Sequence, residues 1–172
     1  GSAIHVKHLI DLSKKLEPAV QPLPLPDLGL IVDPKVAAIM LDFEKEQQVF
    51  ITSLRTVTNA AELNKMAMDR DPSPFYISRL LALAADDSPV EMRREALVQA
   101  CRMIRNTGRP SAASREVLDK IQAFVGDRSL SEAALGLANN TSKESIAFLQ
   151  RLIKENPHKN VQAAACFSLA TV

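Results

Sequence analysis

Apolar residues recur every three or four positions along most of the chain, a spacing typical of helices that bury one face. The first such segment is residues 3–17, where four apolar side chains share a face: Ile4, Leu9, Leu12 and Leu16. We predict a short amphipathic helix there, which ends before Pro18. The preceding Gly1-Ser2 is typical of the remnant of a cleaved expression tag, so it has no part in the predicted fold.

Residues 18–34 follow a different pattern, with closely spaced prolines and large apolar residues between them. The prolines are Pro18, Pro22, Pro24, Pro26 and Pro34, and the apolar residues include Leu23, Leu25, Leu28, Leu30 and Ile31. Proline removes a backbone donor and blocks helix, so this strap is predicted to be extended. A free linker has little use for so many leucines, and we therefore expect the strap to lie across a helical surface. Docking to a proline-recognition domain is the alternative.

Helix-start signals divide residues 35–172 into capped helices. Asp33 before Pro34 predicts a long helix to about Thr56. Asn59 has capping-box spacing and predicts a short helix through Met68. Six further helices are predicted over about 73–85, 90–105, 114–126, 130–138, 143–156 and 160–172, with a capping box at Ser88–Glu91, a cap at Ser111 or Ser114, and a last helix that is still running at Val172.

These six helices pair naturally as three hairpins. Their second helices begin near Val90, Leu130 and Val161, at intervals close to the roughly 34 to 47 residues of known helical-hairpin repeats. Each second helix carries small residues on one face, as closely packed inner helices require. The predicted fold is therefore all-α: an α-solenoid-like array of helical hairpins, of the HEAT or TPR kind, preceded by a long helix and the Pro-rich strap.

The composition agrees with a folded helical protein and excludes some partners. Hydrophobic residues make up 47% and aromatic residues only 4%, which favours helix over sheet. The net charge of +1 gives no overall field to attract nucleic acid or an anionic membrane. No apolar run approaches the about 18 residues that a membrane-spanning helix needs, and no intact secretion signal opens the chain.

Residues with catalytic or metal-binding chemistry are few and scattered. His5 and His8 lie three apart without a third ligand nearby, and His158 occupies an exposed-looking turn. The aspartates that could suggest a calcium loop lack its spacing and read as turn and cap residues: Asp69, Asp71, Asp86 and Asp87. No Gly-rich phosphate loop occurs. We therefore expect no catalytic, cofactor-binding or metal site in this chain, and no cofactor.

Cysteine and arginine are two further residue types that could form sites. Cys101 and Cys166 lie far apart in apolar helical runs, and we predict that both are buried structural thiols, with a mutual disulfide as the alternative. The densest charge is a group of arginines on and after one predicted helix: Arg93, Arg94, Arg102, Arg105 and Arg109. Without interleaved aromatic residues they indicate a solvated face, partly paired with Glu91 and Glu95, rather than a nucleic-acid groove.

Two segments resemble a known group of proteins. They are PSPFYISRLLALAADDSPVEMRREALVQACRMI and SKESIAFLQRLIKENPHKNVQAAACFSLA, and the phrase Asn156-Pro157-His158, followed by Val161-Gln162 and Ala165-Cys166, is the most specific part. Over roughly residues 72–170 the chain resembles the helical region that precedes a thioredoxin-fold domain in bacterial redoxin or TlpA-like proteins. The resemblance implies a spacer in a protein of the periplasm or cell envelope. The CxxC of such proteins lies in the downstream domain, outside this chain.

These observations predict a non-catalytic helical scaffold or protein-interaction module attached to a C-terminal thioredoxin-like domain. The whole protein would then be a thiol-disulfide oxidoreductase. A free-standing HEAT- or TPR-like adaptor for a peptide or protein is the alternative, and an enzyme is a third, more remote one. The last helix carries no stop signal and is nearly all small or apolar. We expect it to be covered by further protein, either the next domain or, by self-association, a second copy.

Overall fold

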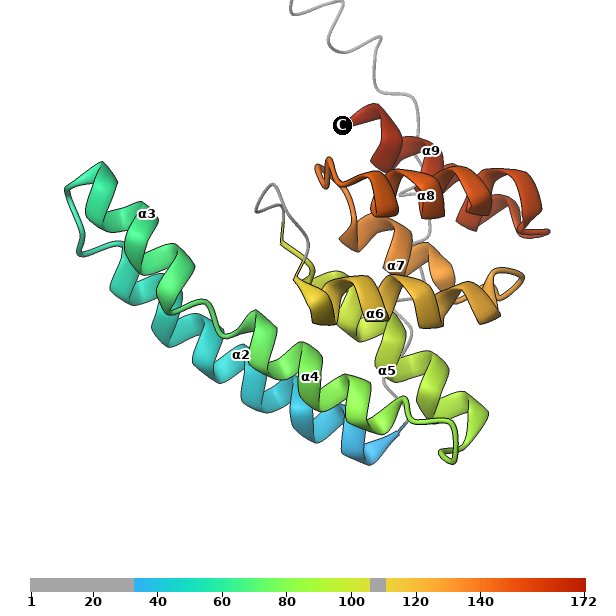
Figure 1. The fold of residues 1–172 in the computed structure, drawn as a ribbon, viewed down its shortest axis with the longest axis horizontal. Helices are drawn as coiled ribbons and strands as arrows, with labels where there is room; N and C mark the ends of the chain where they lie inside the picture. Colours follow the sequence, from blue (N-terminus) through green and yellow to red (C-terminus); the bar gives the residue numbers. More distant parts are fainter. Residues whose placement is uncertain (1–32, 106–110) are drawn as a thin grey trace, which may run out of the picture. The chain divides into compact units, whose positions relative to one another are not determined.

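The computed structural model describes residues 33–105 and 111–172, and every regular element in these ranges is helical. The helices are α2 (Pro34–Leu54), α3 (Ala60–Asp69), α4 (Ser73–Leu83), α5 (Val90–Met103), α6 (Ala112–Ile121), the 3₁₀ turn η1 (Gln122–Phe124), α7 (Leu130–Gly136), α8 (Lys143–Glu155) and α9 (Lys159–Ala170), shown in Figure 1. The all-α fold class is thus confirmed. The predicted N-terminal helix and Pro-rich strap lie outside the described residues, except for Asp33 and Pro34.

Four of the eight described α-helices, α2, α3, α6 and α8, begin with a side-chain cap. The Asp33 side chain accepts hydrogen bonds from the backbone N–H groups of Lys35 and Val36, at 2.8 and 3.2 Å. Asn59 caps α3 in the same way, and Ser111 and Ser142 cap α6 and α8. An N-cap side chain satisfies donors that have no partner inside the helix. These starts are set locally, which is why the sequence predicted them.

Three predictions about where helices begin or end were wrong. The N-cap of α5 is Pro89, so Ser88 lies one residue too early for its side chain to cap the helix, and the predicted capping box does not form. The α6 helix ends at Ile121 and tightens into η1 instead of continuing to Gly126. The last helix ends at Ala170 with Thr171 as its C-cap, so it does not run to Val172.

Thr171 explains where α9 ends. Its hydroxyl donates to the backbone oxygen of Ser168, in the last helical turn, at 2.7 Å, and its backbone N–H donates to the same carbonyl at 3.3 Å. The Thr171 hydroxyl oxygen in turn accepts the backbone N–H of Asn139, in the turn after α7, at 3.0 Å. Asn139 adopts a positive φ of 64°, a conformation that asparagine tolerates better than most residues. The end of α9 is therefore tied to the turn between α7 and α8.

The helices contact one another in two series. In the first, α4 packs on α6 and α6 on α8; in the second, α5 packs on α7 and α7 on α9. The hairpins α4–α5 and α8–α9 also pack closely, as predicted. The middle pair departs from the prediction, because α6 packs mainly on α4, α5 and α8, whereas α7 packs on α5 and α9. The seven-residue α7 therefore packs against α5 and α9 and does not form a closely packed hairpin with α6.

The core is built around the second series. In α5 every residue from Ala96 to Cys101 is buried, so this helix is surrounded by its neighbours. Small side chains line the inner faces, as predicted: Ala96, Ala100, Ala133, Ala134, Ala164 and Ala165 are buried. Larger buried side chains from α6 and α8 fill the remaining space, including Leu118, Phe148 and Leu152. Small residues let the backbones approach closely while the leucines fill the space between the helices.

Candidate interaction surfaces

The arginines predicted as a solvated face lie in separate ion pairs. These pairs are Arg93 with Asp86 at 3.6 Å, Arg94 with Asp127 at 2.9 Å, Arg102 with Glu132 at 3.5 Å, and Arg105 with Asp71 at 3.8 Å. Arg109 lies outside the described residues. The acidic partners come from other segments of the chain, whereas the sequence suggested Glu91 and Glu95 on the same helix. The positive charge of these four arginines is thus balanced by acidic partners on several different segments.

The two cysteines differ in environment. Cys101 is fully buried on α5, as predicted, and burial raises the pKa of its thiol. Cys166 is exposed on α9, so the prediction that it is buried was wrong. Both are free thiols. Because small and apolar residues occupy both faces of α9, its residue pattern does not indicate which face is buried.

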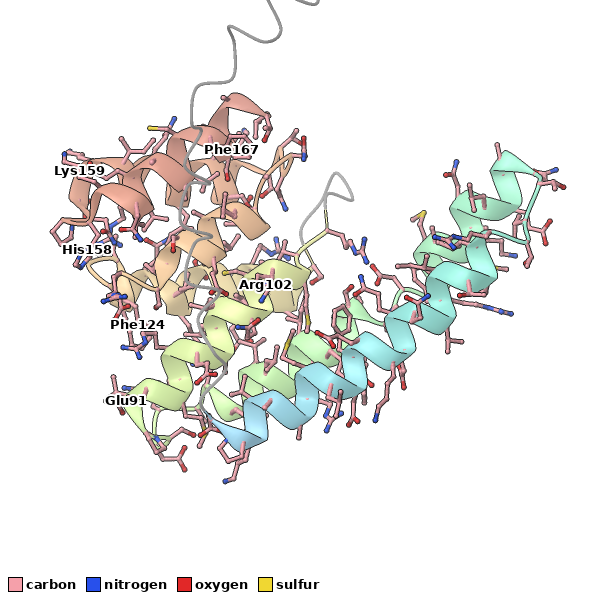
Figure 2. The ribbon with its side chains drawn as sticks, turned by 180° about the vertical axis from the view of Figure 1, so that it is seen from behind. Glu91, Arg102, Phe124, His158, Lys159 and Phe167 are labelled. Carbon is pink, nitrogen blue, oxygen red and sulfur yellow. The ribbon has the colours of Figure 1, made fainter. Side chains whose placement is uncertain are left out.

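Asp71, Asp86, Asp87 and His158 lie in connections, turns and caps, as predicted, whereas Asp69 is the last residue of α3. Asp71 accepts hydrogen bonds from the backbone and the hydroxyl of Ser73, at 3.0 and 2.7 Å, before α4 begins. His158 is the exposed N-cap residue of α9, where Figure 2 labels it beside Lys159. His5 and His8 lie outside the described residues. Within residues 33–105 and 111–172, no three His, Cys, Asp or Glu side chains are grouped so that they could hold a metal ion.

The outer face of α9 is apolar. Ala163, Cys166, Phe167 and Ala170 are all exposed and follow the spacing of one helix face. Phe167 is 60% exposed and is labelled in Figure 2. The opposite face is buried, and the Ser168 hydroxyl there donates to the backbone oxygen of Ala134 at 2.8 Å. The sequence contains no charged residue after Lys159, so no charge interrupts this outer face.

A cavity of about 420 Å³ lies where α2 meets the ends of α5 and α7. Its polar lining includes Glu44 and Gln47 from α2, Arg102 and Arg105 from the end of α5, and Asn139 after α7. Its apolar lining includes Met40, Phe43 and Ile104. Arg102, which Figure 2 labels, also donates to the side chain of Gln99 at 2.9 Å. The sequence reasoning missed this cavity, because Glu44 and Gln47 look like ordinary solvated positions on a long helix.

The comparisons with known proteins give no further guidance. No protein-family model, curated protein or solved structure matches the chain. In the part of the chain that the structure describes, no helix has the length and apolar character to cross a membrane. The resemblance to redoxin-associated helical regions is therefore carried by the sequence phrases alone, and it remains a prediction.

Proposed function

We propose that this chain is a non-catalytic helical scaffold that binds protein through the outer face of α9. The observation that carries the proposal is this face itself, where Phe167 is exposed and no charged side chain follows Lys159. Contiguous exposed apolar surface in a folded protein is typical of a site where another protein docks. Burying a side chain such as that of Phe167 contributes about 1.5 to 3 kcal/mol, so one docking contact there is substantial.

The succession in which the helices contact one another supports an α-solenoid-like arrangement. The helices α4, α6 and α8 follow one another in one series, and α5, α7 and α9 follow one another in the other. In solenoids each repeat contacts its neighbours, and a terminal repeat needs either a polar outer face or a cover. The α9 helix would be the terminal helix of the second series, and its outer face is apolar. We infer that this face is a docking surface.

The occupant that we propose is a thioredoxin-like redox domain of the same protein, encoded beyond Val172. The full-length protein would then be a thiol-disulfide oxidoreductase, with this region as its scaffold in the periplasm or cell envelope. This part of the proposal rests on the resemblance carried by Asn156-Pro157-His158 and the residues that follow it. The complete gene is its first test, because it must encode a CxxC after Val172.

Hydrogen exchange in the full-length protein is the second test. We expect the backbone amides of α9 to exchange more slowly there than in the 172-residue chain, because docking covers the helix. F167D should return α9 to the faster exchange without unfolding the scaffold. F75D is the matched control, because Phe75 is also 60% exposed but lies on α4. Equal exchange of α9 in the two proteins would show that nothing docks on this face.

A specific observation favours the alternative of a free-standing adaptor. The cavity between α2, α5 and α7 has the size of sites that bind small ligands or a short peptide segment. Arg102 and Arg105 line the cavity and would bind an acidic group of such a segment in competition with their own partners, Glu132 and Asp71. A complete gene that ends near Val172 without a CxxC would support this alternative. R105E would then weaken binding of an acidic peptide, whereas R115E, an exposed change on α6, would not.

A further inference from the structure

The distal half of α2 and all of α3 form a two-helix arm, residues 46–70, that buries no side chain. The buried residues of α2 all lie in its first half and end at Phe43, and α3 has none. In Figure 1 α3 lies along the far end of α2, which is the helix it chiefly contacts. The arm nevertheless carries a substantial apolar set: Val49, Phe50, Ile51, Leu54, Val57, Leu63, Met66 and Met68. Two helices alone cannot cover both of their apolar faces.

An apolar groove lies between the distal half of α2 and the connection from α3 to α4. It has a volume of about 320 Å³ and is lined by Glu46, Val49, Phe50 and Ser53 from α2 and by Arg70 and Pro72 from the other wall. Val49 is 71% exposed. The two walls carry opposite charges, since Glu46 stands on the α2 wall and Arg70 on the wall between α3 and α4. The whole arm is balanced, with Glu46, Glu62 and Asp69 against Arg55, Lys65 and Arg70.

We propose that the arm pairs with the arm of a second copy of this chain, so that two hairpins close into a four-helix bundle. A two-fold axis along the groove places the α2 wall of one copy over the α3–α4 wall of the other. Glu46 of each copy then faces Arg70 of its partner, because a two-fold interface repeats each contact. A groove with a negative and a positive wall is complementary to a second copy of the same groove, because the two-fold axis brings each wall opposite the wall of the other sign. A partner of another sequence would need its own charges of both signs at the same spacing.

The size of the arm fits this occupant. The arm spans residues 46–70, which is long enough for each of its two helices to contribute about two to three turns to a helical bundle. Four-helix bundles bury the apolar stripes that a single hairpin leaves open. The arm's balanced charge also removes the repulsion that two like-charged surfaces would meet. This interface is separate from the outer face of α9, so the dimer and the docking proposed for α9 are tested independently.

Sedimentation equilibrium of the 172-residue chain at tens of micromolar tests the dimer. We expect a dimer for the unchanged protein and a monomer for V49D, with the dimer dissociation constant raised roughly a hundredfold by the buried, unpaired charge. Two controls keep the arm intact: L41D, on the first half of α2, and F167D, on α9; both replace exposed side chains. A monomeric unchanged protein, or a dimer that V49D leaves intact and F167D disrupts, would overturn the proposal.

A charge-swap mixture tests the pairing itself. E46R alone and R70E alone should each be monomeric, because each places like charges opposite one another across the two-fold axis. An equimolar mixture of the two variants should form a heterodimer, since every cross-copy pair is again of opposite sign. Far-UV circular dichroism establishes that each variant is folded before mixing. A mixture that stays monomeric although both variants are folded would contradict the predicted contact between Glu46 and Arg70.

Discussion

Gly136 lies so close to Arg102 that a Cβ added to the glycine would be 2.7 Å from the arginine's Cα. The contact joins α7 to α5, the most deeply buried helix, and both residues line the cavity beside α2. A real Cβ does not approach a backbone atom so closely, and a backbone atom cannot rotate away as a side chain can. Glycine at this position therefore sets the distance between two helices.

Replacing Gly136 by alanine should lower the free energy of unfolding by about 1 to 3 kcal/mol, the usual cost of overfilling a packed contact. Urea denaturation followed by circular dichroism measures it. Gly126 provides the control, because a Cβ there would meet nothing within 4 Å. G126A should be neutral or slightly stabilising. Equal effects of the two changes would show that the contact between α5 and α7 relaxes without cost.

How far the sequence could predict this structure depends on the range of the interactions involved. The starts of α2 and α3 were predictable, because Asp33 and Asn59 cap residues two and three positions ahead. The sequence could not predict which face of α9 is exposed, since apolar residues occupy both of its faces. The fit of Gly136 against Arg102 depends on residues 34 positions apart, and nothing in the local pattern indicates it.

The candidate surfaces illustrate the same limit. The long helix predicted to start after Asp33 is confirmed as α2, but the structure buries side chains only in its first half. The number of elements that pack around a helix depends on the assembled fold. The spacing of apolar residues along the helix does not predict that number. For the same reason the cavity beside α2 could not be predicted, although the apolar character of the last helix could.

Asn156 should prove to be a structural residue. Its side chain is 1% exposed and donates to the backbone oxygens of Val125 and Asp127, at 2.6 and 3.0 Å, while its own oxygen accepts the N–H of His158 at 2.8 Å. It thus connects the end of α8 with the turn between η1 and α7. N156A should cost about 1 to 3 kcal/mol of stability, because the change leaves buried polar groups without partners.

The matched control for this change is N160A. Asn160 is exposed in the first turn of α9, and its replacement should alter the free energy of unfolding by less than about 0.5 kcal/mol. Thermal and urea unfolding of both variants measure the difference. If N156A were as stable as N160A, water would be replacing the asparagine, and the Asn-Pro-His phrase would have no structural role.

The two thiols should react at very different rates with a thiol reagent in the native protein. Cys166 is exposed and should be labelled promptly, whereas Cys101 is fully buried, and its raised pKa keeps it protonated. Labelling of Cys101 should therefore await unfolding. C166S should remove the fast phase and leave the slow one. A fast reaction that survives in C166S would show that α5 opens readily in the native state.

The ion pair between Asp127 and Arg94 should make stability depend on pH. Burial opposes the charged carboxylate, but hydrogen bonds from the backbone and hydroxyl of Ser129, together with Arg94 at 2.9 Å, outweigh it and lower the pKa of Asp127. In the unfolded chain the pKa returns to about 3.8. The carboxylate therefore stabilises the fold above that pH, and the contribution is lost as the pH falls through the lower, folded value.

D127N should accordingly be less stable than the unchanged protein near pH 6. The two stabilities should begin to converge below about pH 4 and should meet only below the lowered, folded pKa of Asp127, where protonation removes the same charge. Urea denaturation at a series of pH values between 2.5 and 7 measures this gap. D119N, a change at an exposed aspartate on α6, controls for the loss of one negative charge from the surface. A gap that stays constant over the whole range would mean that Asp127 acts as a neutral hydrogen-bond acceptor for Ser129, and that its charge adds nothing to the turn before α7.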